Sequence, residues 1–302
     1  MPLQRCSNEK DSSLTTPAFS YSHLKKDIPN DITGERYTTT DHITSTSESF
    51  ISCTWDSCSS TDAGGAIYLQ EDYPLTVIDC SFVYCKSKTA SSNYYWGGGA
   101  IAFVSTDLLD IKSTSFIHCS ASGVRGGAIH VHDIGNVLIS HSLFLDCVCS
   151  TVGGGILVED EPSLSLSSSH FIDCHTKIGG ACGFYKRKST FSVSNCLFAN
   201  NKASDLSIGG GAIVDCLYPS SYLSQYRFSF FTQNKAYVAN DIAVIDNAYS
   251  SSPIMHCFTT TNEKSFYNCG NEAVNWLPLT NINLLSLHTF TSFNVVSTQT
   301  DT

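Results

Sequence analysis

The sequence lacks any long apolar segment and is poor in basic residues. Its 302 residues include 17 Lys and Arg against 27 Asp and Glu, which gives a formal net charge of −10. Nucleic acid repels such an acidic chain, so we expect no nucleic-acid partner. No run approaches the roughly 20 apolar residues of a membrane-spanning helix, and the first residues lack the apolar core of a secretory signal. We therefore expect no transmembrane segment, membrane anchor or signal peptide in this chain.

Two further absences restrict the fold and its modification. No stretch repeats apolar residues at intervals of three and four over the length that a helix needs. Leucine-rich, ankyrin and helical-repeat folds are therefore excluded. No Asn-x-Ser/Thr tripeptide occurs, although Ser and Thr are abundant, so N-linked glycans are not expected.

The chain contains instead two motifs that alternate at nearly constant spacing. The first is Gly-Gly-Ala-Ile or a close variant, and its last residue is Ile67, Ile101, Ile129, Ile156, Cys182 or Ile213. The second is an aromatic residue followed three positions later by Cys or Asn, and it begins at Trp55, Phe82, Phe116, Phe144, Phe171, Phe198, Phe231 and Phe266. Regular repeats of this length are typical of solenoids. Insertions concentrate between the aromatic motif and the next glycine motif, so one face should carry the variable loops.

Short runs of alternating apolar and polar residues follow each glycine motif, as in Ile129-His130-Val131, and a second such run follows later. This alternation is typical of strands. We predict an all-β fold, a right-handed single-stranded parallel β-helix of about seven coils with two or three strands per coil, rising about 4.8 Å per coil. The β-helix should span 43–246, between a weakly ordered Ser/Thr-rich tail over 1–42 and a degenerate last coil with a C-terminal cap over 247–302. Apolar residues 281–290 could form that cap.

Stacking of successive coils should place equivalent side chains above one another. The phenylalanines should form an internal ladder, and a second column should contain Cys58, Cys85, Cys119, Cys147, Cys174, Asn201 and Asn234. Buried Cys packs as a small hydrophobe, so reduced thiols are favoured over disulfides between coils. Ligands in a straight column do not surround a zinc ion, so we expect neither metal nor cofactor. The glycines should permit positive φ and close backbone approach.

The two motifs resemble the repeat signature of the chlamydial polymorphic membrane proteins and of similar β-helix repeat proteins in some protists. The resemblance covers about residues 43–246, and this chain departs from it by having Cys where the family has Asn in most coils. It implies a non-catalytic, adhesin-like β-helix that is secreted or exposed at the cell surface.

The first candidate site is the variable loop face. Its longest insertion contains Tyr94, Tyr95 and Trp96, and basic residues occur at corresponding places: Lys86, Arg125, His175, Lys177, Lys202 and Lys235. Aromatic rings beside cations on a rigid scaffold suit a protein partner or an anionic glycan. Alternatively, the aromatic residues cover a coil and the lysines are solubilising charges.

The second candidate site is a polar column two positions after each ladder aromatic. It would bring Asp146 and Asp173 about 5 Å apart, the carboxylate separation of retaining glycosidases, with His118 beside them as a proton carrier. These residues define the alternative function, a polysaccharide-acting hydrolase or lyase on a pectinase-like β-helix. Alternatively, they are ordinary polar corner residues.

A third group consists of charged turn residues. Asp133, Glu159, Asp160 and Glu161 should pair with 186–188 in the next coil, and His132 should pair with Glu159. Exposed pairs of this kind contribute at most about 1 kcal/mol each. We therefore favour the binding scaffold over the enzyme.

Overall fold

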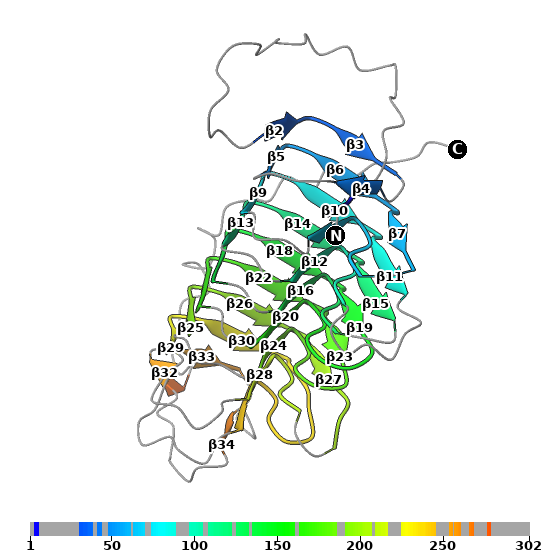
Figure 1. Cartoon of the computed structure of the whole chain (residues 1–302). Helices are drawn as coiled ribbons and strands as arrows, with labels where there is room; N and C mark the ends of the chain where they lie inside the picture. The colour runs from blue at the N-terminus through cyan, green and yellow to red at the C-terminus, as the bar shows by residue number, and fades with distance from the viewer. Residues whose placement is uncertain are drawn as a thin grey trace, which may run out of the picture.

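The computed structural model is a single stack of β-strand coils along one long axis (Figure 1). The part of the chain that it describes contains strands and no helix. Consequently, no helix in that part is long and apolar enough to cross a membrane. The described residues are 3–5, 30–38, 41–43, 48–61, 63–69, 74–88, 97–104, 108–122, 125–132, 135–160, 163–185, 191–206, 209–216, 225–245, 254–255, 257–260, 266–268 and 277–278.

Four sheets run along the stack, and the chain visits them in the order A, B, C, D in each complete coil. Sheet A follows the glycine motif and contains β8 (Ile67–Leu69), β12 (Ile101–Val104), β16 (Ile129–His132), β20 (Ile156–Glu159), β24 (Cys182–Tyr185), β28 (Ile213–Cys216), β31 (Ile242–Ile245) and β34 (Phe266–Asn268). Sheet B contains β2 (Asn30–Thr33), β5 (Glu48–Ile51), β9 (Leu75–Ile78), β13 (Leu108–Lys112), β17 (Asn136–Ser140), β21 (Ser163–Ser167), β25 (Phe191–Ser194), β29 (Gln225–Arg227) and β32 (Ile254–Met255).

The other two sheets follow the second half of each coil. Sheet C holds the aromatic motif in β3 (Arg36–Tyr37), β6 (Thr54–Asp56), β10 (Ser81–Val83), β14 (Ser115–Ile117), β18 (Leu143–Leu145), β22 (His170–Ile172), β26 (Leu197–Ala199), β30 (Phe230–Thr232), β33 (Phe258–Thr259) and β35 (Leu277–Pro278). Sheet D contains β7 (Ser59–Ser60), β11 (Lys86–Lys88), β15 (Ser120–Ser122), β19 (Val148–Cys149), β23 (His175–Thr176) and β27 (Lys202–Ala203).

The parallel β-helix is confirmed, with two differences in detail. There are about six turns rather than seven, and a complete coil has four strands rather than two or three. The additional strand is sheet D, whose segments are only two or three residues long. Such short strands show too little alternation to be recognised from sequence.

Parallel pairing also extends beyond the expected ends of the repeat. It begins with β2, which pairs with β5, whereas we placed the start of the β-helix at residue 43. At the other end, β34 still pairs in parallel with β31. A further strand, β1 (Leu3–Arg5), pairs antiparallel with β4 (Asp41–Ile43) and with β8. The proposed cap over residues 281–290 lies outside the described residues.

The aromatic ladder is confirmed along the inside of sheet C. Phe116 is in register with Phe82 and Phe144, and Phe144 is in register with Phe171. Successive rings from Trp55 to Phe231 stack with centroids 4.4–5.1 Å apart and interplanar angles of 2–9°. All of these rings are fully buried. The ladder therefore forms a continuous core that holds each coil directly above the next.

The Cys and Asn column lies beside this ladder, at the turn from sheet C to sheet D. Its buried free thiols include Cys85, Cys119, Cys147 and Cys174. The Cys147 thiol donates a hydrogen bond to the carbonyl oxygen of Phe116, with a donor–acceptor distance of 3.5 Å. Asn201 donates in the same way to the carbonyl oxygen of Phe171, at 3.0 Å. Cys and Asn thus serve the same carbonyl in equivalent coils, which explains how one can replace the other.

A second buried polar column was not recognised in the sequence. It lies two positions before each aromatic residue and contains Cys53, Cys80, Thr114, Ser142, Ser169, Cys196 and Ser229. The hydroxyl of Ser142 donates to the carbonyl oxygen of Ser140, at the end of β17, and accepts the backbone N–H of Thr114. Since such small side chains satisfy backbone groups at the turn from sheet B to sheet C, this column stabilises that corner.

The glycine motif has the backbone role expected from the sequence. Gly98 adopts φ of +72°, a conformation that L side chains rarely adopt. A Cβ atom on Gly99 would lie 2.1 Å from the carbonyl oxygen of Gly127 in the next coil. The first glycine is therefore required for the turn and the second for the close contact between coils.

Candidate functional site

The polar column suspected of catalysis lies at the turn between sheets C and D. All of its members have φ between 50° and 57°: Ser57, Tyr84, His118, Asp146, Asp173, Asn200 and Gln233. Asn, Asp and His are the non-glycine residues that best tolerate this left-handed conformation. The backbone geometry alone thus favours the residue types found here, without any catalytic requirement.

Part of this column lines a shallow depression of about 410 Å³ that is open to solvent. Its lining residues come from successive coils and are His118, Leu145, Asp146, Asp173, His175, Asn200 and Lys202. The expected neighbours Asp146, Asp173 and His118 are therefore brought together. The side chains of His118 and Asp146 remain 38% and 41% exposed, so water reaches the carboxylate.

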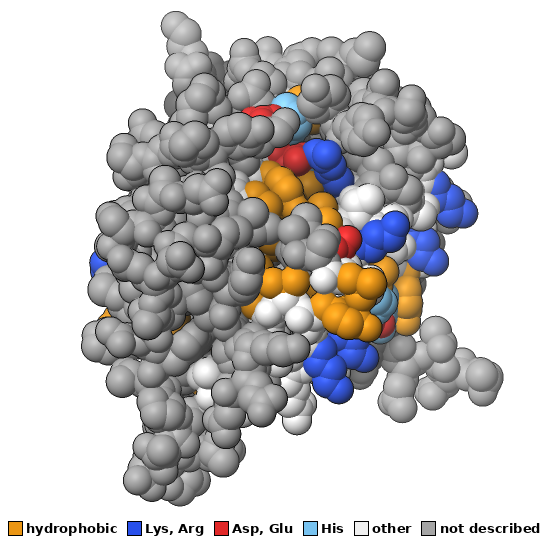
Figure 2. Space-filling model, turned by 90° about the horizontal axis from the view of Figure 1, so that it is seen from below, with side chains coloured by type: hydrophobic (Ala, Val, Ile, Leu, Met, Phe, Trp, Pro, Cys, Tyr) orange, Lys and Arg blue, Asp and Glu red, His pale blue; other side chains and the backbone are white. Residues whose placement is uncertain are grey.

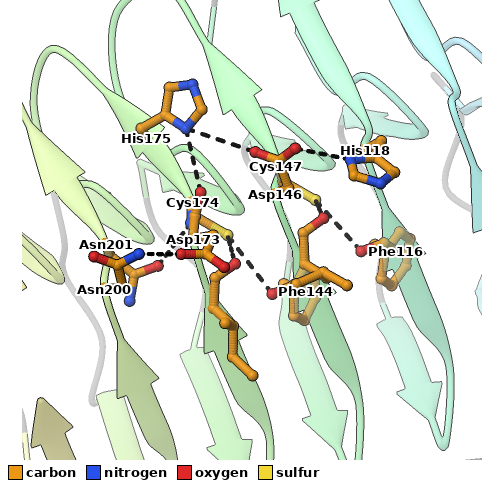
Figure 3. A network of polar contacts seen from close by, with 12 residues as sticks. Phe116, His118, Phe144, Asp146, Cys147, Asp173, Cys174, His175, Asn200 and Asn201 are labelled. Atoms are coloured by element: carbon orange, nitrogen blue, oxygen red, sulfur yellow. Dashed lines mark hydrogen bonds and ion pairs between the residues drawn. The ribbon is translucent and has the colours of Figure 1, made fainter. Parts of the chain in front are cut away.

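Each of the two carboxylates has a different neighbour as its hydrogen-bond partner (Figure 3). Nδ1 of His118 lies 2.8 Å from Oδ2 of Asp146, while Nδ1 of His175 lies 3.8 Å from the other oxygen. The amide of Asn200 donates to Asp173. Among the described residues, no hydrogen bond joins Asp146 to Asp173, and each carboxylate is held by its own neighbour.

The aromatic residues of the longest insertion, Tyr94, Tyr95 and Trp96, lie outside the described residues. Gly97, which follows them, forms a bridge with Arg125 in the next coil. The Arg125 guanidinium donates to the carboxylate of Glu159, and its side chain is 27% exposed. Of the predicted cationic binding residues, Arg125 thus already has a carboxylate partner within the protein.

The remaining basic residues of this face lie on or beside sheet D. Lys86 and Lys177 are both exposed, as are His175, Lys202 and Lys235. Lys202 is in register with His175 on one side and with Lys235 on the other. Seen from the C-terminal end of the stack, most visible Lys and Arg side chains gather on the right, the side on which sheet D lies in Figure 1 (Figure 2). These residues were expected on the loop face, but their alignment in one column was not predicted.

The signal for this cationic column was present in the sequence. His175, Lys202 and Lys235 each come directly after the Cys or Asn of the aromatic motif. Since that motif fixes the register, the following residue must also form a column. Exposed Tyr237, two residues beyond Lys235, was likewise missed because its coil has a degenerate glycine motif.

The charged turn differs from the expectation in its pairing. His132 does not pair with Glu159, although the two are in register. Nε2 of His132 instead lies 2.8 Å from Oδ2 of Asp160. Glu159 is buried and contacts Arg125 and Nε2 of His130, the latter at 3.0 Å. Asp133, Glu161 and residues 186–188 lie outside the described residues.

The environment of Glu159 changes its acidity. Burial by itself would raise the pKa of this carboxyl, but the hydrogen bond from His130 and the positive charges of His130 and Arg125 outweigh it. Together they lower the pKa of Glu159 from 4.5 to about 2. Glu159 therefore forms a buried ion pair with Arg125. The pair lies on the outer face of sheet A but differs from an exposed surface pair because its carboxylate is shielded from water.

Comparison with known proteins identifies the repeat. A family model described as a right-handed β-helix region matches residues 30–218, and its match begins where β2 begins. No curated protein sequence and no solved structure is similar enough to count as a match. Because the family match covers more than half of the 302 residues and agrees with the four parallel sheets, the chain belongs to the right-handed β-helix family.

Proposed function

We propose that this β-helix is a non-catalytic binding scaffold, secreted or exposed at the cell surface, that holds a glycan or protein ligand on the variable loop face beside sheet D. The resemblance of its two motifs to those of the chlamydial polymorphic membrane proteins supports this location and an adhesin-like role. A β-helix is also the scaffold of pectinase-like hydrolases, so the fold by itself favours neither class. The choice depends on the site.

One observation carries the proposal: Asp146 and Asp173 are each hydrogen-bonded to a different neighbour in a shallow, solvent-open depression. Hydrolysis by a carboxylate pair requires one group to donate a proton to the leaving group while the other attacks or activates water. Enzymes support such chemistry by excluding bulk water from the reacting groups. An open surface with carboxylates that accept hydrogen bonds is better suited to hold a ligand than to cleave it.

The scaffold also fits a binding role. Buried aromatic rings stack through the interior from Trp55 to Phe231, so the coils form a continuous hydrophobic core. Loops on a rigid scaffold can vary in sequence and length with little effect on that core. The concentration of insertions at one corner is thus the pattern expected of a ligand-binding face.

A glycan array tests the proposal directly. The wild-type chain should bind saturably to at least one glycan, and replacement of Tyr94, Tyr95 and Trp96 by Ala should abolish or strongly weaken that binding. The matched control replaces Leu138, an exposed residue of sheet B, by Ala, and should bind as the wild type does. If the wild-type protein bound no glycan on the array and no protein from an extract of its source organism, the scaffold proposal would be wrong.

The hydrolase or lyase remains the second candidate because His118 and Asp146 are 2.8 Å apart, a geometry that could orient a proton carrier. Release of reducing sugar from polysaccharides tests it, with Asp146→Asn and Asp173→Asn as variants. Sugar release that disappears in both variants would replace the scaffold proposal with this one.

A further inference from the structure

Sheet D presents a column of basic side chains in an acidic protein. In successive coils, His175, Lys202 and Lys235 are exposed and lie opposite one another in register. Lys177 is exposed directly after β23. The chain as a whole carries a formal net charge of −10, so a local excess of cations here is contrary to its overall composition.

This arrangement is unfavourable for the protein alone. Like charges directly opposite each other on neighbouring strands destabilise a sheet, and strands lie only about 4.8 Å apart. Among the described residues, no carboxylate lies within ion-pair distance of Lys177, Lys202 or Lys235. His175 has Asp146 at 3.8 Å, but Lys202 and Lys235 break this local rule without an ion pair inside the protein, which is typical of a functional surface. A negatively charged ligand would supply the compensation.

The groups beside these lysines indicate what kind of anion fits. Asp146, Asp173 and Asn200 lie along the neighbouring turn and can accept hydrogen bonds from hydroxyl groups. Tyr237 is 64% exposed two residues beyond Lys235 and offers an aromatic face. Sugars combine hydroxyl donors with an apolar ring face, and acidic sugars add the negative charge.

We propose that the outer surface of sheet D at the coils of β23 and β27 and at Lys235 binds an extended acidic glycan, whose sugars carry carboxylates or sulfates and whose chain runs along the long axis of the stack. This inference rests on the proposed binding function and names its ligand class. Lys202 and Lys235 pair with the acidic groups of successive sugars, while the adjacent turn column accepts hydrogen bonds from their hydroxyls.

The same surface does not suit nucleic acid. The phosphate backbone of DNA presents acceptors and no hydroxyl donors, so it cannot donate hydrogen bonds to Asp146 and Asp173 as the hydroxyl groups of a sugar can.

Calorimetric titration of the full chain with polygalacturonate and with chondroitin sulfate tests the inference. The test variant combines Lys202→Gln with Lys235→Gln, and the matched control combines Arg36→Gln on β3 with Lys112→Gln on β13, both outside sheet D. Both variants remove two exposed positive charges. We expect the test variant to weaken binding of at least one acidic glycan by about tenfold, as for two lost ion pairs, and the control to leave it unchanged.

Several results would overturn the inference. Fully methyl-esterified polygalacturonate should not bind, so equal binding of the ester and the acid would exclude charge recognition. Equal losses in the two variants would indicate a response to net charge alone, and competition by single-stranded DNA at equal charge concentration would indicate an unselective polyanion surface. On the glycan array, the protein could bind only neutral glycans, with the lysine variants binding as the wild type does. That result would refute an acidic glycan as the ligand and leave the proposed scaffold function intact.

Discussion

At the scale of single residues, the backbone explains much of what the surface displays. Two columns of turns have positive φ at non-glycine residues, one from Ser57 to Gln233 and one from Ser52 to Phe228. Small polar residues predominate in both columns because their side chains tolerate this conformation best. A carboxylate in such a column is thus first a turn residue, and an additional role needs independent evidence from its neighbours.

Glu159 is the residue whose environment is most distinctive, and it yields a prediction on stability. Glu159→Gln should destabilise the protein by about 3 kcal/mol at neutral pH, because Arg125 and His130 would lose their buried carboxylate partner. The folded-state pKa of about 2 lies below the ordinary 4.5. The contribution of Glu159 is therefore fully present above pH 4.5 and is lost as the pH falls towards 2.

Urea denaturation of wild type and variant at several pH values between 7 and 3 measures this difference. Glu35→Gln, which removes one carboxylate from a partly exposed position, serves as the control and should change stability little. A wild-type advantage over Glu159→Gln that stays constant down to pH 3 would contradict the assigned ion pair.

At the scale of structural elements, three of the four corners of the coil depend on a column of side chains or glycines that serves the backbone. The turn from C to D uses Cys or Asn, and the turn from B to C uses Ser, Thr or Cys. The entry into sheet A uses glycines that touch the next coil. The three columns differ in chemistry but all satisfy or accommodate backbone atoms between coils.

The glycine column gives a steric prediction. Gly99→Ala should prevent accumulation of soluble folded protein, because the new Cβ atom would lie 2.1 Å from the Gly127 carbonyl oxygen and 2.5 Å from the backbone nitrogen of Ser120. Gly34→Ala is the matched control, since no atom lies within 4 Å of its added Cβ. Its positive φ should cost only about 1 kcal/mol. Equal soluble yields and melting temperatures for the two variants would be inconsistent with this packing.

The Asn column gives a graded prediction. Asn201→Ala should cost about 2–4 kcal/mol, because the buried Cys174 N–H and Phe171 carbonyl would lose their partner. Asn201→Cys should cost less, since a thiol can donate to that carbonyl as Cys174 donates to Phe144. Chemical denaturation ranks the two variants, and a Cys variant no more stable than the Ala variant would show that the thiol does not replace the amide.

At the scale of the whole molecule, each coil contacts mainly its two neighbours, as expected of a solenoid. Stability is then close to a sum of coil and interface contributions. The interior changes towards the C-terminal coils, where buried Asp215 accepts a hydrogen bond from the Tyr226 hydroxyl and buried Asp241 accepts one from Asn234. These two buried carboxylates have hydrogen-bond partners within the protein, so the stack can hold polar side chains in its interior.

Removal of one coil tests this modular organisation. Deletion of residues 171–197 joins His170 to Phe198, which occupies the same ladder position as Phe171. The shortened chain should remain a soluble β-protein by circular dichroism and unfold at a lower denaturant concentration than the full chain. Deletion of residues 171–184, which joins His170 of sheet C to Tyr185 of sheet A and so shifts the register by half a coil, provides the control. If both deletions were equally disruptive, register between coils would not determine the fold.

The sequence by itself determined the repeat, the parallel β-helix, the aromatic ladder and the role of the glycines. These features follow from local alternation and from spacing that places like residues above one another, and both can be counted along the chain. The sequence also predicted that Asp146, Asp173 and His118 lie on one face, because each follows a ladder phenylalanine by two positions.

The tertiary structure decided what each of those residues contacts. Glu159 pairs with Arg125, which lies more than one coil earlier, and Asp146 contacts His118 instead of Asp173. The short strands of sheet D are recognisable only in the stacked structure. The same structure shows that Lys202 is in register with Lys235. The physical reason is that column membership depends on spacing along the chain, whereas contacts depend on side-chain direction and on competition among all neighbours within reach.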